Sequence, residues 1–154
     1  MAKEIERKFL TTGDQWRSAT PVYYCQGYLN RDKKRTVRVR VAGDKAMLTI
    51  KGPTHGMSRD EYEYDIPVED AKEMFALCEQ PLVEKNRRVI NHAGLDWEVD
   101  EFLGANEGLV VAEVELESED QDVPLPDWIG PEVSSDPRYF NSNLSQNPFT
   151  KWAT

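Results

Sequence analysis

Seven segments of this chain alternate charged residues with mostly apolar ones, and an eighth alternates polar and aromatic residues. Because successive side chains of a β-strand point to opposite faces of a sheet, a period of two predicts strands with chemically different faces. The segments are residues 4–9, 23–30, 37–41, 48–51, 61–64, 85–89, 97–100 and 111–116. Charges of both signs on nearly every strand favour a sheet closed into a barrel, with the charged face inside and the apolar face covered by helices.

Turn signals divide the chain into eight strands, for which we expect mostly sequential, antiparallel pairing in a meander. We expect them near residues 4–9, 22–31, 36–42, 45–51, 58–66, 82–92, 95–103 and 108–117. An apolar stripe with helical spacing predicts one helix near 68–79, and shorter helices are expected before Pro21 and over 138–144. The predicted fold class is α+β dominated by β: an eight-stranded antiparallel closed barrel with a charged interior and helices packed on the outside.

Length, charge and cysteine content narrow the function classes. With 154 residues we expect one domain spanning 1–154, and a net charge of −9 argues against a nucleic-acid partner. No apolar run approaches the roughly 20 residues of a membrane helix, so we expect no membrane partner. The first residues carry no apolar signal region, and the two cysteines, Cys25 and Cys78, fit a reduced compartment. The expected location is therefore cytoplasmic.

Sorting the strands by the alternation gives the expected inner set of charges. The acids are Glu4, Glu6, Glu61, Glu63, Glu98, Asp100, Glu113 and Glu115, and the bases are Lys8, Arg38, Arg40, Lys51, Lys85 and Arg87. Carboxylates two residues apart raise each other's pKa unless a cation lies between them, which favours hard divalent ions. Arginine offers a planar pair of donors to phosphate. Acids and bases in one cavity suit a metal–polyphosphate complex; the alternative is an open half-barrel whose charges face water.

The first of these motifs, Glu4-Ile5-Glu6-Arg7-Lys8, is similar to the E-x-E-x-K motif of the CYTH superfamily, the triphosphate tunnel metalloenzymes. Further elements resemble the family in the same order: residues 38–40, 48–52, 59–63, 85–87, 98–100 and 113–115. Residues 128–133 and 136–139 resemble its compact bacterial members. The resemblance covers essentially the whole chain and implies an eight-stranded antiparallel tunnel that binds triphosphate substrates with Mg²⁺ or Mn²⁺. For the mechanism we expect two ions at each site, one on the triphosphate and one on the carboxylates.

The resemblance also implies roles for individual residues. The implied metal ligands are Glu4, Glu6, Asp100, Glu113 and Glu115, and the implied substrate-binding residues are Lys8, Arg38, Arg40, Lys51, Lys85 and Arg87. Glu61, Glu63 and Lys85 are the catalytic candidates. Many relatives also carry a basic residue in the C-terminal helix, where this chain has Asn141 and its polar neighbours. Either Arg138 supplies that contact as a further substrate-binding residue, or the contact is missing.

The expected activity is metal-dependent hydrolysis of inorganic tripolyphosphate to pyrophosphate and phosphate, with a small-molecule triphosphate as the partner. The chain is short, and no inserted segment is suited to bind a nucleobase or a thiamine ring. Four alternatives stay open: a nucleoside triphosphatase, a thiamine triphosphatase, an adenylate cyclase of the same fold, and a non-catalytic polyphosphate-binding module. A homodimer is also possible, because the few expected helices can leave part of the apolar outer face uncovered.

Overall fold

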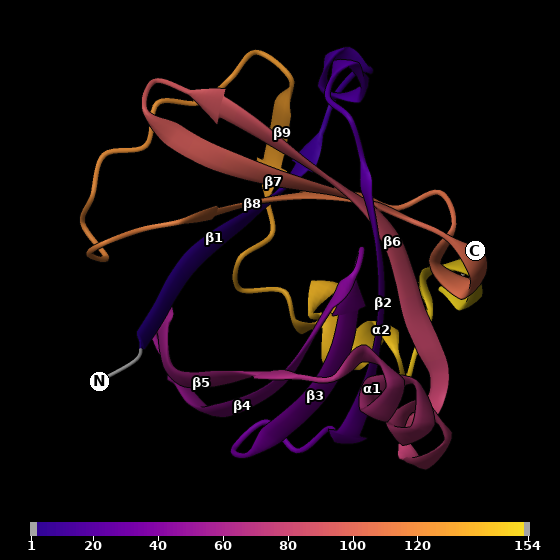
Figure 1. Ribbon diagram of the computed structural model, residues 1–154. Helices are drawn as coiled ribbons and strands as arrows, with labels where there is room; N and C mark the ends of the chain where they lie inside the picture. The colour runs from indigo at the N-terminus through magenta and orange to yellow at the C-terminus, as the bar shows by residue number, and fades with distance from the viewer. Residues whose placement is uncertain (1–2, 153–154) are drawn as a thin grey trace.

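The computed structural model describes residues 3–152, which form one antiparallel sheet and several short helices (Figure 1). The strands are β1 (Lys3–Thr11), β2 (Val22–Asn30), β3 (Thr36–Ala42), β4 (Lys45–His55), β5 (Ser58–Ile66), β6 (Glu79–His92), β7 (Leu95–Phe102), β8 (Val110–Glu115) and β9 (Ile129–Glu132). The α-helices are α1 (Val68–Met74) and α2 (Asn141–Leu144), and 3-10 helices cover Gln15–Ser18, Phe75–Leu77, Gly104–Asn106, Pro137–Tyr139 and Phe149–Lys151. Among residues 3–152, no helix has the length and apolar character needed to cross a membrane.

Eight of the strands close into an antiparallel barrel, as the alternation predicts. The order is β5-β4-β3-β2-β6-β7-β8-β1-β9, and β5 closes the barrel by pairing with β1. The expected, mostly sequential pairing holds within β2–β5 and within β6–β8. It fails at two places, because β1 pairs with β5 and β8 rather than with β2, and β6 pairs with β2 rather than with β5. The chain leaves β5 through α1 and returns beside β2, so β6 extends the sheet on the far edge of β2.

A ninth strand lies outside the predicted set. The short strand β9 pairs with the end of β1, where Phe9 lies opposite Glu132 and Thr11 opposite Ile129. Proline is compatible with this position, since Pro131 lies in a strand at the edge of the sheet order, where a missing N–H donor is tolerated. The segment that the prolines interrupt therefore still contributes to the sheet.

The predicted helix over 68–79 is shorter in the structure. Helix α1 ends at Met74, a 3-10 turn covers Phe75–Leu77, and β6 already begins at Glu79. The residue before a proline avoids helical backbone, so Gln80-Pro81 does not continue the helix. The helix end packs closely on β2, because a Cβ on Gly27 would lie only 2.8 Å from Cys78 Cβ. The glycine at this position therefore permits the contact.

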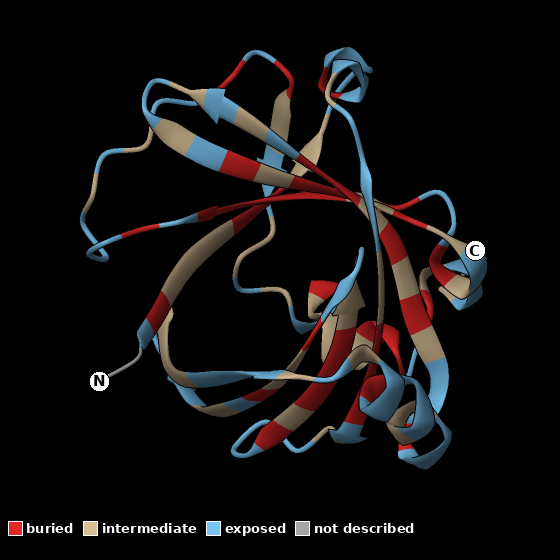
Figure 2. Ribbon diagram, viewed as in Figure 1, coloured by how far each residue is buried: buried red, intermediate tan, exposed pale blue. Residues whose placement is uncertain are grey.

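The apolar core lies on the outside of the barrel, between its wall and the covering segments. Trp97, predicted on the outer face, is fully buried against Phe9 and Trp128. Ala71 of α1 covers Val39, and the C-terminal segment covers a third cluster. Figure 2 shows buried and less buried residues alternating along β6, as expected for a wall with two different faces.

Part of the outer face of β4 and β5 is not covered. Ile50 and Tyr62 are each 39% exposed, and Tyr64 is 58% exposed. Ile50 lies opposite Tyr62 in the sheet, so these side chains are neighbours. The sequence-based expectation of an incompletely covered outer face is confirmed here, and the homodimer stays a prediction.

Candidate functional site

The interior of the barrel is a cavity of about 340 Å³ with a charged lining. Most of the predicted site residues line it: Glu4, Glu6, Lys8, Arg38, Arg40, Lys51, Glu61, Glu63, Lys85, Arg87, Glu113 and Glu115. Each of these residues lies on the same face of its strand because the alternation holds along all of the contributing strands. The alternative of an open half-barrel with charges in water is therefore wrong.

One wall of the cavity, formed by β1 and β8, is acidic. Glu6 lies opposite Glu115, and Lys8 lies opposite Glu113. Lys8 Nζ is 3.4 Å from Glu113 Oε1 and 3.9 Å from Glu6 Oε1. Burial and the neighbouring carboxylates of Glu113 and Glu4 raise the pKa of Glu6 well above its usual value. Lys8 therefore balances only part of the negative charge on this wall.

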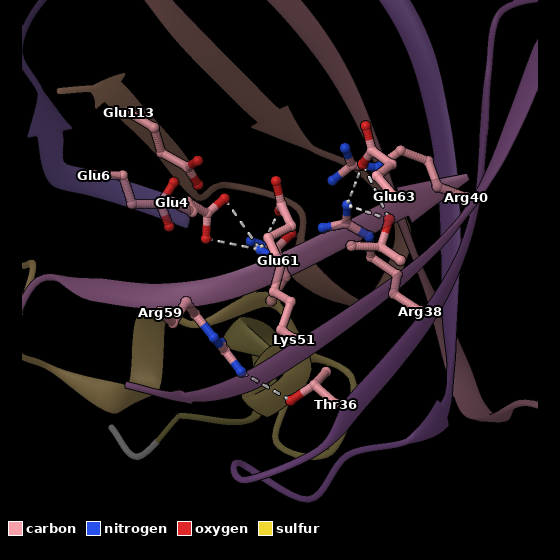
Figure 3. A network of polar contacts seen from close by, with 12 residues as sticks. Glu4, Glu6, Thr36, Arg38, Arg40, Lys51, Arg59, Glu61, Glu63 and Glu113 are labelled. Carbon is pink, nitrogen blue, oxygen red and sulfur yellow. Dashed lines mark hydrogen bonds and ion pairs between the residues drawn. The ribbon is translucent and has the colours of Figure 1, made fainter. Parts of the chain in front are cut away.

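A second basic side chain bridges the acidic wall to β5. Lys51 Nζ donates to Glu4 Oε1 at 3.0 Å and lies 3.3 Å from Glu61 Oε2 (Figure 3). Burial and the negative charge of Glu4 raise the pKa of Glu61. Lys51 therefore holds a positive charge between two carboxylates that belong to different strands.

The acidic wall has the donor chemistry for a hard divalent cation. Glu4, Glu6 and Glu113 supply carboxylate oxygens, which Mg²⁺ and Mn²⁺ prefer, and the raised pKa of Glu6 indicates excess negative charge. Within residues 3–152, no three acidic, histidine or cysteine side chains already converge as a preformed metal site. The residues fit a divalent ion by their chemistry and by their common wall.

The opposite wall, formed by β2, β3 and β6, is basic. Arg40 Nε donates to Gln26 Oε1 at 2.9 Å, and among residues 3–152 Arg40 forms no ion pair. Arg38 Nη2 donates to Thr49 Oγ1 at 3.2 Å, but its buried Nε has no hydrogen-bond partner. Burial and repulsion from Arg38 and Arg87 lower the pKa of Arg40 to about 10. Arg38 also lies 3.5 Å from Glu63 Oε2, so within residues 3–152 it is Arg40 that gives this wall a positive charge without an ion-pair partner.

Tyr24 is a site residue that the sequence analysis missed. Its ring centre lies 5.0 Å from Arg40 Cζ and 4.7 Å from Arg87 Cζ, so it contacts both guanidinium groups. Both contacts have cation–π geometry. The signal was present, because Tyr24 has the same parity along β2 as the inward-facing Gln26 and Tyr28.

Asp100 is the one predicted metal ligand that the structure does not place in the cavity lining with the others. It is fully buried, and it accepts from Arg87 Nε at 2.7 Å and lies 2.7 Å from Lys85 Nζ. Burial alone would raise the pKa of Asp100, but Arg87 and Lys85 outweigh it and lower that pKa. The carboxylate does not line the cavity, since both bases lie against it. Asp100 therefore anchors two basic side chains in this structure.

Lys85 is held between Asp100 and the C-terminal helix. Its Nζ donates to Asn141 Oδ1 of α2 at 3.0 Å, and Gln26 Nε2 donates to the same oxygen at 3.2 Å. Burial, followed by repulsion from Arg87 and Arg40, lowers the pKa of Lys85 to about 7, although Asp100 acts in the opposite direction. Asn141 therefore takes the inward position in this helix.

Arg138 lies outside the cavity, so the structure does not bring it together with the other predicted substrate-binding residues. Its guanidinium pairs with Asp136 at 2.7 Å, its side chain is 60% exposed, and it lies 5.0 Å from the ring centre of Trp152. Parity arguments apply to strands, and Arg138 belongs to a 3-10 helix instead. A different arginine, Arg59, lines the cavity and was missed, although it shares the parity of Glu61 and Glu63.

Comparisons with known proteins agree with this architecture. The CYTH domain matches residues 2–145 of the chain. The chain is 56% identical over 151 residues to an inorganic triphosphatase of Acetivibrio thermocellus, with 97% of each chain covered. It is 38% identical over 148 residues to an inorganic triphosphatase of Nitrosomonas europaea, covering 92% of this chain and 96% of that protein.

A solved structure matches over a similar extent. The crystal structure of the inorganic triphosphatase NE1496 has a TM-score of 0.68 to this structure at 34% identity, covering 94% of this chain and 95% of that one. The resemblance identified from the charged motifs is thereby confirmed. This chain belongs to the CYTH domain family.

Proposed function

We propose that this chain hydrolyses inorganic triphosphate to pyrophosphate and phosphate with the help of a divalent cation. The observation that carries the proposal is the division of one cavity into an acidic wall and a basic wall. The acidic wall suits a metal ion and the basic wall suits phosphate oxygens. The names of the two curated relatives, each called inorganic triphosphatase, support the same reaction.

The basic wall binds and orients the substrate in this proposal. Arg38 and Arg40 bind phosphoryl oxygens, because both are buried in the cavity lining. Arg40 forms no ion pair within residues 3–152, and Arg38 lies 3.5 Å from the half-exposed carboxylate of Glu63. Arg87 reaches the same cavity from a fixed position, since Asp100 holds it. Fixed donors stabilise the charge of a transferring phosphoryl group and hold it in line with the attacking water.

The acidic wall holds the cation in this proposal, through Glu4, Glu6, Glu113 and Glu115. When bound there, Mg²⁺ or Mn²⁺ neutralises phosphate charge and polarises water, and we propose two ions for each site. Glu61 and Glu63 are the candidates to accept the proton of the attacking water. Burial raises the pKa of Glu61, which brings its basicity closer to neutral pH.

An inorganic substrate suits the cavity better than an organic triphosphate. The aromatic rings on the lining are already engaged, since Tyr24 contacts two arginines and Phe140 lies 5.4 Å from Lys8 Nζ. The hydroxyl of Tyr28 accepts a hydrogen bond from Gln26 Nε2. A nucleobase or thiamine ring would therefore compete with existing contacts for any stacking surface.

Phosphate release from tripolyphosphate, ATP and thiamine triphosphate, measured side by side with Mg²⁺, Mn²⁺ and EDTA, tests the proposal. We expect metal-dependent release with a clear preference for tripolyphosphate. Preference for ATP or thiamine triphosphate would overturn the choice of substrate. Formation of cyclic AMP from ATP would point to a cyclase, and tight binding without release would point to a binding module.

A further inference from the structure

The turn between β2 and β3 is strongly basic in a chain that is strongly acidic. Residues 31–35 contain four basic residues and one acid, whereas the whole chain has a net charge of −9. A triphosphate is itself a polyanion, so the average field of this protein repels it. A local concentration of positive charge therefore matters most where it lies close to the cavity.

Hydrogen bonds place this turn at the rim of the cavity. Thr36 follows the turn directly, lines the cavity and lies opposite Lys51 in the sheet. Arg59, which also lines the cavity, donates from Nη2 to Thr36 Oγ1 at 3.2 Å (Figure 3). The same Nη2 donates to Lys33 O at 3.4 Å. The turn is thus attached directly to the wall that encloses the site.

The backbone of the turn is held by its own polar contacts. Asp32 Oδ1 accepts from Lys34 N at 2.8 Å, and Asn30 Oδ1 accepts from Asp32 N at 3.1 Å. Asn30 Nδ2 donates to Arg35 O at 3.1 Å, and Thr36 Oγ1 donates to Asp32 O at 2.9 Å. These contacts fix the backbone from which the basic side chains extend.

Most of the basic side chains in the turn form no strong ion pair within residues 3–152. Lys33 and Lys34 are exposed and form no ion pair within residues 3–152. Arg35 is 78% exposed along its side chain and lies 3.7 Å from Asp32, a separation that water screens strongly. Arg31 differs, because it is bonded to Ser145 and lies close to Glu79. The turn residues with available charge are therefore Lys33, Lys34 and Arg35.

The basic turn continues the basic wall of the cavity. The next inward-facing residue after Thr36 is Arg38, whose buried Nε has no partner, and Arg40 follows it. The β4–β5 hairpin lies at the same end of the barrel, and there Met57 N donates to Oε1 of Glu119, which belongs to an acidic segment, at 3.5 Å. The positive charge of the basic wall therefore continues along β3 to the turn at this end of the barrel.

We propose that Lys33, Lys34 and Arg35 attract the triphosphate anion and guide it onto the basic wall of the cavity. This inference rests on the proposed function, and it adds an approach route to it. Electrostatic fields of this kind raise the local substrate concentration and the association rate by about 10- to 1,000-fold. Dissolved salt screens such fields, so the effect weakens as ionic strength rises. The turn acts before binding and takes no part in the chemical step.

The test compares K33Q/K34Q/R35Q with the control K45Q/K72Q/K151Q, which changes net charge equally. The control residues are exposed and lie outside the cavity lining, and Lys45 pairs with Ala42 at the far end of β3. We expect kcat/KM for tripolyphosphate to fall on the order of tenfold in the turn variant at low ionic strength, with kcat unchanged. At high salt we expect the turn variant and the wild type to have the same kcat/KM. The control variant should match the wild type at every ionic strength.

Three outcomes would overturn the proposal: identical behaviour of both variants, a loss in kcat, or a difference that persists at high salt. Calorimetric binding of tripolyphosphate in EDTA, repeated over a range of salt, decides the question without turnover. We expect the dependence of affinity on salt to be weaker in the turn variant than in the control. Equal dependence would reject the approach route even if the chain proves not to hydrolyse triphosphate, and failure of turnover alone would reject only the proposed function.

Discussion

Asp100 holds Arg87 through two parallel hydrogen bonds, from Nε to Oδ1 at 2.7 Å and from Nη2 to Oδ2 at 2.9 Å. The carboxylate is fully buried and also pairs with Lys85. A paired geometry of this kind fixes the orientation of a guanidinium group. The basic wall is therefore built on a buried acid that itself does not reach the cavity.

We expect Asp100→Asn to destabilise the protein and to leave the metal requirement unchanged. Breaking a buried ion pair by removing one partner costs about 3–5 kcal/mol, because the other charge stays buried. Urea unfolding measures that loss, and the Mn²⁺ concentration for half-maximal activity measures the metal site. A raised Mn²⁺ requirement with unchanged stability would restore Asp100 as a metal ligand. Glu113→Gln, a change on the acidic wall, is the matched variant that should raise it.

Replacement of Arg40 separates activity from stability. Arg40→Gln removes a buried charge that burial, Arg38 and Arg87 already disfavour, so we expect the free energy of unfolding to stay level or rise by about 1 kcal/mol. We expect kcat/KM for tripolyphosphate to fall by about 10- to 100-fold, the value of a hydrogen bond to a charged group. Arg138→Gln, which lies outside the cavity, should leave kcat/KM unchanged. Equal losses in both variants would contradict the assignment of these two arginines.

The lowered pKa of Lys85 predicts a pH dependence. The Lys85 ammonium has a pKa of about 7 in the folded chain against 10.5 as its ordinary value, so it loses its proton as pH rises above neutral. Substrate binding through this charge should then weaken, and kcat/KM should fall on the alkaline side. Lys85→Met should remove that limb of the pH profile. A limb that persists in Lys85→Met would assign it to another group.

The lowered pKa of Lys85 also makes the free energy of unfolding depend on pH. Between pH 7 and 10.5 the unfolded chain binds the Lys85 proton and the folded chain does not. The contribution of Lys85 to the free energy of unfolding therefore rises with pH in this window. Urea unfolding of wild type and Lys85→Met across the window measures it, and a difference that is independent of pH would contradict the shift.

Tyr24 should matter through its ring and not through its hydroxyl. Contacts with Arg40 and Arg87 of cation–π geometry are worth about 0.5–2 kcal/mol, so Tyr24→Leu should raise KM by roughly 2- to 30-fold. Tyr24→Phe keeps both contacts and should resemble the wild type. Steady-state kinetics of both variants measure whether the ring or the hydroxyl of Tyr24 contributes to substrate binding.

The sequence determines which face of each strand is charged, but not the neighbours of each strand. The alternation placed Glu6, Arg40 and Trp97 on the correct faces, because parity is a property of one strand alone. The order of strands depends on where α1 carries the chain, and no local pattern encodes that crossing.

The site was predicted least well where parity gives no information. Arg138 and Asn141 lie in short helical turns, so their directions depend on packing at the end of the barrel. Asp100 has the correct parity, but its pairing with Arg87 and Lys85 became visible only in the register of β6 with β7. Tyr24 was not predicted because the site was inferred from charged residues, and its side chain is uncharged.

The most direct test of the central claim is the product balance from tripolyphosphate, followed by phosphorus NMR in the presence of Mg²⁺. We predict that pyrophosphate and phosphate accumulate in equal amounts, that EDTA abolishes the reaction, and that Glu113→Gln loses turnover while it still binds tripolyphosphate. The absence of products, or an undiminished rate in EDTA or in Glu113→Gln, would contradict the account of a metal-assisted hydrolase.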